Sequence, residues 1–300
     1  MDANPSTTAK SATTPESATT SNWSDSSSDR RIVVGYDGSE DALSALRWAV
    51  EEATRARADL LVVACIDPRE TGREEVCPPL EPVESAASRL LATSGSDSTP
   101  GDFRLLVARD VPWTRLVVES AGSGMLVIGT SSHLLLGAWR LGAVTHELLQ
   151  HASGPVTLVP RQASSQSAGR IVVAIDGTTS GAALAWAAQR AEDRSCELIV
   201  VHGSERTAGA PGPAPDRVLA DACRDAERLT SQRVIPRLVD GPITASLLAP
   251  EFHTDLLVLG TGGVHRAGPY SGSVARAIAA GATSPTVMVR QPPRPDDTTG

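Results

Sequence analysis

The clearest chemical signal in the sequence is a segment, residues 255–275, that joins an apolar run, a glycine-rich loop and a helical pattern. Its first part, Leu256–Leu259, predicts a buried parallel strand, and Gly260 and Gly263 follow it closely. Glycine lets a ligand approach the main chain, and a helix N-terminus offers unpaired N–H groups with a partial positive charge. A strand, a glycine loop and a helix in this order therefore favour phosphate binding.

The helical pattern of this segment begins after Gly272, with Ser273 and Val274 at its start. The Ser273 hydroxyl could cap the helix or donate a hydrogen bond to a phosphate. The same residues also fit a plain strand-to-helix turn in which glycine serves the backbone geometry alone. A lone glycine loop does not separate these two interpretations, so the rest of the chain has to decide between them.

Two apolar runs lead to an aspartate that is followed by Gly-Ser or Gly-Thr. The run Ile32–Val34 leads to Asp37, and the run that begins at Ile171 leads to Asp176. In open parallel sheets, ligands bind at the carboxyl ends of the strands, where these carboxylates could accept from an amine or hydroxyl group. The alternative is an Asx-turn that closes the strand-to-helix corner. We favour the ligand role for Asp176 and leave Asp37 open between the two.

Apolar runs alternate with helical patterns from Arg31 onwards, and each run is short and apolar on both faces. This alternation predicts an α/β three-layer sandwich around a mostly parallel sheet. Gly129 ends the fourth run, and Gly142 opens the helix that follows. The five strands expected in the first half are Ile32–Val34, Leu60–Ile66, Phe103–Val107, Met125–Ile128 and Val156–Val159.

The whole pattern begins again at Arg170, after roughly 130–140 residues, a period far longer than a solenoid unit. RIVVAIDGT repeats RIVVGYDGS, and Leu-Ala-Trp-Ala repeats Leu-Arg-Trp-Ala, with Trp48 and Trp186 assigned to core packing. We therefore expect two domains, 30–160 and 170–290, joined by a polar linker at 161–169. The arm 1–29 and the tail 291–300 are expected to be disordered, because the arm is rich in serine and threonine and has few apolar residues.

Three features, each present in both halves, resemble the universal stress protein family in its tandem two-domain form. They are a strand that leads to Asp-Gly-Ser or Asp-Gly-Thr, the Leu-x-Trp-Ala helix, and a strand–Gly–loop–Gly–helix segment that ends in a strand led by proline. The similarity covers nearly everything from Arg31 to Arg290. It implies two Rossmann-like domains of the adenine-nucleotide alpha hydrolase type, each with a five-stranded, mostly parallel sheet.

Some members of this family bind ATP through a pattern of Gly, two residues, Gly, nine residues, Gly and then Ser or Thr. The resemblance implies that an aspartate faces the adenine, that the glycines and hydroxyl hold phosphate and ribose, and that Mg²⁺ could bridge the phosphates. This chain has eight residues rather than nine between the last two glycines of its second half. The implied ATP-binding residues of that half are Asp176, Gly260, Gly263, Gly272, Ser273 and Val274.

In the first half, Asp37, Gly129 and Gly142 match the pattern, with a loop of the right length. Ser132 replaces the second glycine, and Ala143 replaces the hydroxyl residue. Losing a hydrogen bond to a charged group is worth roughly 1.5–3 kcal/mol, or about ten- to a hundredfold in affinity. We therefore expect the first site to be weak or empty.

Composition excludes several other classes of function. A net charge of −8 argues against a nucleic-acid-binding surface and against a polybasic membrane patch. No apolar run approaches the length of a membrane span, and the four cysteines form no Cys-x-x-Cys pair, which favours a reducing cytoplasm. Metal-ligand clusters, a Gly-x-Ser-x-Gly elbow and a Walker-type lysine are absent from the sequence. We expect a cytoplasmic adenine-nucleotide-binding protein with at most slow ATP hydrolysis.

Two other hypotheses remain open. The chain could be a nucleotide-independent scaffold that binds a protein partner. In that case Val156–Val159 and Thr286–Val289 would pair at an internal two-fold axis, as the family associates through this strand. The sequence leaves open whether two chains also form a homodimer. An ATP pyrophosphatase of related fold ranks lower, because Asp-Gly-Ser and Asp-Gly-Thr stand where those enzymes carry a Ser-Gly-Gly-type loop.

Overall fold

The computed structural model defines the fold of both expected halves. The N-terminal arm and the C-terminal tail lie outside the described residues, as do Gly263, Gly272, Ser273 and Val274. The structure describes residues 30–69, 78–92, 102–130, 133–135, 138–140, 142–161, 163, 168–176, 181–204, 214–241, 243–249, 252–261, 277–278 and 281–290.

Strands and helices alternate in both halves, as the hydrophobic pattern predicts. The first half comprises β1 (Ile32–Tyr36), α1 (Glu40–Ala56), β2 (Leu60–Ile66), α2 (Glu81–Ala92), β3 (Phe103–Arg109), α3 (Pro112–Ser120), β4 (Met125–Thr130), β5 (His133–Leu135), β6 (Ala138–Arg140), α4 (Ala143–His151) and β7 (Val156–Pro160). The second half comprises β8 (Arg170–Ile175), α5 (Gly181–Arg194), β9 (Glu197–Gly203), α6 (Pro215–Glu227), β10 (Val234–Val239), α7 (Ile243–Leu247), β11 (Leu256–Thr261) and β12 (Thr286–Arg290).

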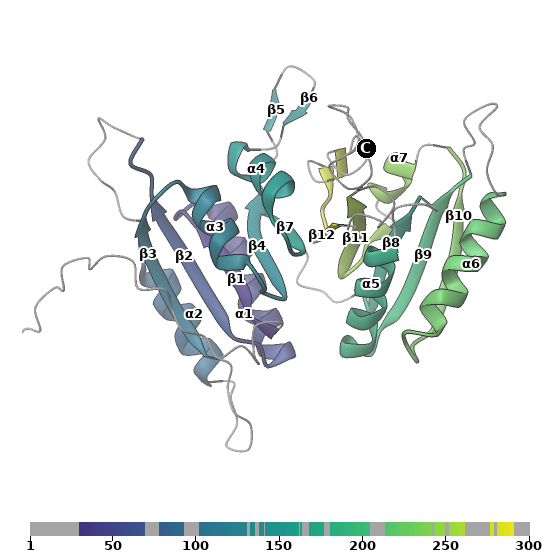
Figure 1. Cartoon of the computed structure of the whole chain (residues 1–300), viewed down its shortest axis with the longest axis horizontal. Helices are drawn as coiled ribbons and strands as arrows, with labels where there is room; N and C mark the ends of the chain where they lie inside the picture. Colours follow the sequence, from purple (N-terminus) through teal and green to yellow (C-terminus); the bar gives the residue numbers. More distant parts are fainter. Residues whose placement is uncertain are drawn as a thin grey trace, which may run out of the picture.

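The main strands form one ten-stranded sheet in the order β10-β9-β8-β11-β12-β7-β4-β1-β2-β3. Neighbours within each half are parallel, so each half supplies a five-stranded parallel sheet with helices on its faces, which confirms the expected fold class (Figure 1). In each half the first strand lies between the second and the fourth. The chain therefore reverses its direction of growth between β1 and β4, and again between β8 and β11. Such switch points are where open sheets of this kind bind ligands.

Local sequence explains how the first helix begins and ends. The Ser39 side chain accepts a hydrogen bond from the backbone N–H of Ala42 at 3.1 Å, and Glu40 and Asp41 lie in the first turn beside the positive end of the helix. The helix ends at Arg57, whose φ of 50° is left-handed, a conformation that usually selects glycine. Helix α1 is thereby anchored directly behind the end of β1.

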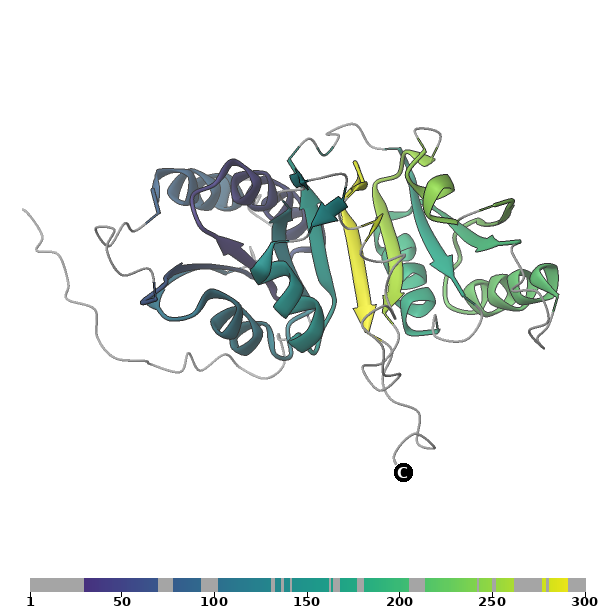
Figure 2. The ribbon, with the colours of Figure 1, turned by 90° about the horizontal axis from the view of Figure 1, so that it is seen from above.

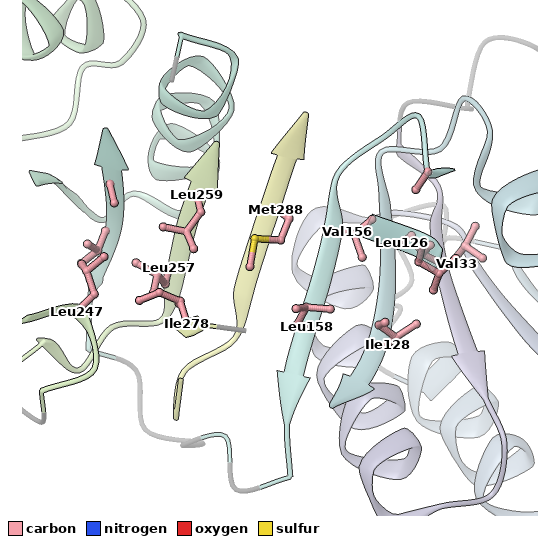
Figure 3. Close-up of a cluster of buried hydrophobic side chains, with 14 of the residues drawn as sticks. Val33, Leu126, Ile128, Val156, Leu158, Leu247, Leu257, Leu259, Ile278 and Met288 are labelled. Atoms are coloured by element: carbon pink, nitrogen blue, oxygen red, sulfur yellow. The ribbon is translucent and has the colours of Figure 1, made fainter. Parts of the chain in front are cut away.

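The two halves are joined by the antiparallel pair β7–β12, at the centre of the molecule (Figure 2). Thr286 pairs with Leu158 and Met288 with Val156, while Val287 pairs with Thr157, its own counterpart in the repeat. The pairing expected between the fifth strands is thus present, and its two-fold axis passes beside the Thr157–Val287 pair. On one face of this joint a single apolar cluster runs from the first half into the second (Figure 3).

On the other face the joint is closed by α1 and α5. Trp48 and Trp186, related by the repeat, each pack against the apolar clusters of both halves, so their packing role includes the contact between the halves. Beside them, Arg194 donates to Glu52 at 2.7 Å, with only 9% and 3% of the two side chains exposed. The half-exposed Arg55 also donates to Glu52, so this buried carboxylate is bonded to two cations.

We expect Thr157→Val to stabilise the protein by about 1 kcal/mol, because Thr157 is fully buried and its hydroxyl has no hydrogen-bond partner in the described part of the chain. The matched control is Thr286→Val on the facing strand, where the buried hydroxyl donates to Ser284 at 3.1 Å. That change should destabilise. Urea denaturation of both variants measures the two shifts, and a destabilised Thr157→Val would contradict the expectation.

We expect Glu52→Ala to destabilise the protein by about 3–5 kcal/mol, because it leaves the buried Arg194 charge without its carboxylate. The double variant Glu52→Leu/Arg194→Leu removes both charges and should lose clearly less stability than Glu52→Ala. A double-mutant cycle read by urea denaturation gives the coupling energy. Additive losses from the two single changes would show that the pair does not join the halves energetically.

Candidate functional site

The ends of β8 and β11 bring two of the sequence-predicted residues together. Ala174 and Leu259 form the last pair of β8 and β11, and Asp176 and Gly260 follow it by two residues and one residue. Asp176 and Gly260 therefore lie at the same carboxyl edge of the sheet, at the switch point of the second half. The Asp176 side chain is exposed at this edge.

The neighbouring strand β9 also ends in polar residues at this edge. The His202 ring bonds through Nδ1 to the carbonyl oxygen of Ile175 at 2.8 Å. A carbonyl can only accept, so Nδ1 carries the proton and Nε2 has the free lone pair in the neutral ring. One residue beyond β9, the Ser204 hydroxyl donates to the Asp240 carboxylate at 2.9 Å. These bonds fix the ends of β8, β9 and β10 relative to one another.

The expected phosphate loop of the second half falls outside the described residues. The ligand-binding roles of Gly263, Gly272, Ser273 and Val274 therefore stay predictions. The chain is described again at Ala277 and Ile278, which are helical. Ile278 is fully buried in the apolar cluster that joins the halves. The helical pattern after the loop therefore packs on the same face of the sheet as α4 does in the first half.

In the first half, the Asp37 carboxylate closes an Asx-turn. Its Oδ1 accepts from the backbone N–H of Ser39 at 2.9 Å, and Gly38 adopts a left-handed φ of 81°. Nearby, the Tyr36 hydroxyl donates to the carbonyl oxygen of Pro79 at 3.0 Å, and burial, followed by the charges of Asp37 and Glu81, raises the Tyr36 pKa. The turn hypothesis therefore accounts for Asp37 without a ligand.

Gly129, at the end of β4, has a packing role that the sequence does not reveal. A Cβ atom there would lie 2.3 Å from the main-chain carbon and oxygen of Asp41. Glycine is needed at this position so that the first turn of α1 can approach the sheet. Gly142 is different, because it is the exposed N-cap of α4, its φ is −58°, and its nearest neighbour, Thr145 Oγ1, is 4.0 Å from where a Cβ would lie.

Sequence alone gives no reason to single out Arg290, which ends β12 beside Thr261 at the candidate edge. The signal that could have found it is the repeat itself. Thr130 occupies the position of Thr261 in the first half, and its partner across the strands is Pro160. The carboxyl edge of the second half therefore has a cationic residue, Arg290, where the edge of the first half has the uncharged Pro160.

The cysteine at the end of β2 is not set up for nucleophilic chemistry. Burial, the largest cause, raises the pKa of the half-buried Cys65 thiol to about 11, so it is protonated at neutral pH. Within the described ranges, no three His, Cys, Asp or Glu side chains cluster as metal ligands would. Among those same residues, none of the helices has the length and apolar character that crossing a bilayer requires.

Comparison with known proteins matches both halves to one family model, described as the universal stress protein family, over residues 29–160 and 168–290. A universal stress protein of Mycobacterium tuberculosis is 25% identical over 320 positions, covering 88% of this chain and 96% of the relative. A universal stress protein of Mycolicibacterium smegmatis is 26% identical, covering 86% of this chain and 96% of the relative. The fold is similar to the crystal structure of a universal stress protein from Archaeoglobus fulgidus, with a TM-score of 0.64, 16% identity and coverage of 88% and 99%.

We expect Gly129→Ala to destabilise the protein by about 3 kcal/mol or more, because the added methyl group would overlap the Asp41 main chain. Gly142→Ser, on the exposed N-cap, should change stability by about 0.5 kcal/mol or less, since serine is a favourable cap. Thermal and urea denaturation without added ligand compare the two. A stable Gly129→Ala protein would contradict the packing role.

Proposed function

Because the chain belongs to the universal stress protein family, we propose that it binds an adenine nucleotide, ATP above all, at the carboxyl edge of its second half. The observation that supports the proposal is the register of β8 and β11, whose last pair is Ala174 with Leu259, because Asp176 and Gly260 follow this pair at the switch point of the second half. Asp176 supplies an exposed carboxylate, and Gly260 begins the glycine-rich segment whose main chain can approach phosphate.

Each part of the nucleotide has a partner in this arrangement. The Asp176 carboxylate accepts from donor groups of the adenosine moiety, and main-chain N–H groups that follow Gly260 hold the phosphates. Mg²⁺ bound to the nucleotide would bridge the phosphates and reduce their charge. This assignment follows the order of residues in the family pattern.

The first half departs from the family pattern, and two of its matching residues have structural roles. The Asp37 carboxylate is engaged in its own turn, and Gly129 is required for the contact between β4 and α1. In addition, Ala143 offers no hydroxyl group at the start of α4. The proposal therefore assigns nucleotide binding to the second half and leaves the first half as its structural counterpart.

A regulatory role, rather than dedicated catalysis, fits this site best. We propose a cytoplasmic protein whose nucleotide occupancy reports on the state of the cell, with ATP hydrolysis slow at most. The described residues hold no activated thiol, because burial raises the pKa of each of Cys65, Cys196 and Cys223. A nucleotide-independent scaffold is the second candidate, favoured by the continuous core that makes one body of the two halves.

We expect Asp176→Asn to weaken ATP binding about tenfold or more, because it removes a charged acceptor. Asp37→Asn, the matched change at the equivalent position of the first half, should leave the affinity unchanged. Isothermal titration calorimetry of the full chain with ATP measures both. If the unaltered protein gives no heat at millimolar ATP, the nucleotide proposal fails and the scaffold function stands.

A further inference from the structure

Arg290 is a cationic side chain that the fold holds at the candidate edge of the second half. It is the last residue of β12, and its partner on β11 is Thr261, one residue beyond Gly260. Along β12 it shares its face with Met288, which belongs to the apolar cluster that also contains Ile278. Arg290 thus lies at the end of the face on which the helix after the phosphate loop packs.

The first half of the chain holds this side chain in place. Its Nη2 group donates to the carbonyl oxygens of Leu149, at 3.2 Å, and Gln150, both near the end of α4. The C-terminal end of a helix carries a partial negative charge, which favours a cation there. These partners are neutral carbonyl groups, and in the described part of the chain Arg290 forms no ion pair with a carboxylate. Its Nε and Nη1 groups keep donors for a further acceptor.

The first half shows the opposite arrangement at the equivalent position. Pro160 replaces Arg290 there and has no charge. The next residue, Arg161, is already engaged by two carboxylates, Glu40 at 2.8 Å and Asp41 at 3.1 Å. Of these two described strand ends, the one with a cation that no carboxylate engages therefore belongs to the half whose glycine pattern is nearly complete.

We propose that Arg290 binds the polyphosphate of the nucleotide and makes the second-half site selective for ATP over ligands without phosphate. This inference rests on the proposed function and adds a residue to it. The chain carries a net charge of −8, which repels a polyanion, so a positioned guanidinium at the edge offsets that repulsion locally. Because Leu149 and Gln150 hold the guanidinium, the first half contributes to the site of the second.

The test compares ATP with adenosine, each titrated calorimetrically into the full chain. Arg290→Gln keeps an N–H₂ group for the α4 carbonyls but removes the charge, and we expect a loss of about tenfold or more in ATP affinity with adenosine affinity unchanged. Arg290→Lys keeps the charge and should bind ATP within about threefold of the original protein. A purely structural role would lower both affinities together and would not be rescued by lysine.

Arg237→Gln is the matched control. Arg237 lies on β10 of the same half, with its guanidinium 4.7 Å from the centre of the Phe252 ring, so this change removes the same charge away from the edge. It should leave the ratio of ATP to adenosine affinity unchanged. If Arg290→Gln changes that ratio no more than Arg237→Gln does, the role of Arg290 is overturned while nucleotide binding stands. If the unaltered protein binds neither ligand, both proposals are wrong.

Discussion

The antiparallel contact between β7 and β12 is the constraint on which the rest of the molecule depends. It turns two parallel sheets into one and lets a single apolar cluster extend through both halves. It also brings α1 close enough to α5 for Glu52 to be buried against Arg194. A charge pair so poorly exposed to water is tolerable only where both partners are held in place, which requires the two halves to keep one fixed relation.

The antiparallel β7–β12 contact also sets where the candidate ligand-binding edges of the two halves lie. Because β7 and β12 run in opposite directions, the carboxyl ends of the strands in the two halves lie at opposite ends of the common sheet. The end of α4, which leads into β7, consequently lies beside the end of β12 and bonds to Arg290. The first half thus supplies structure to the edge of the second, although the chain is duplicated from one pattern.

The sequence was sufficient for the parts of the fold that depend on local periodicity. Apolar runs predicted the strands of the first half closely. The pairing of the fifth strands followed from the family resemblance and is present. Contacts between residues far apart in the chain could not be predicted, because no local pattern records them. Thus neither the partnership of Glu52 with Arg194 nor that of Arg290 with α4 was foreseen.

The site shows why a glycine is weak evidence for a ligand even when a family pattern predicts it. Gly129 matches the pattern, yet the main chain of Asp41 alone explains why no side chain fits there. The same steric need would retain a glycine in a half that had lost its ligand. Charged residues indicate a ligand-binding half better than glycines do, since packing does not require an arginine rather than a proline at a strand end. The contrast between Arg290 and Pro160 therefore distinguishes the two halves more strongly than the glycines do.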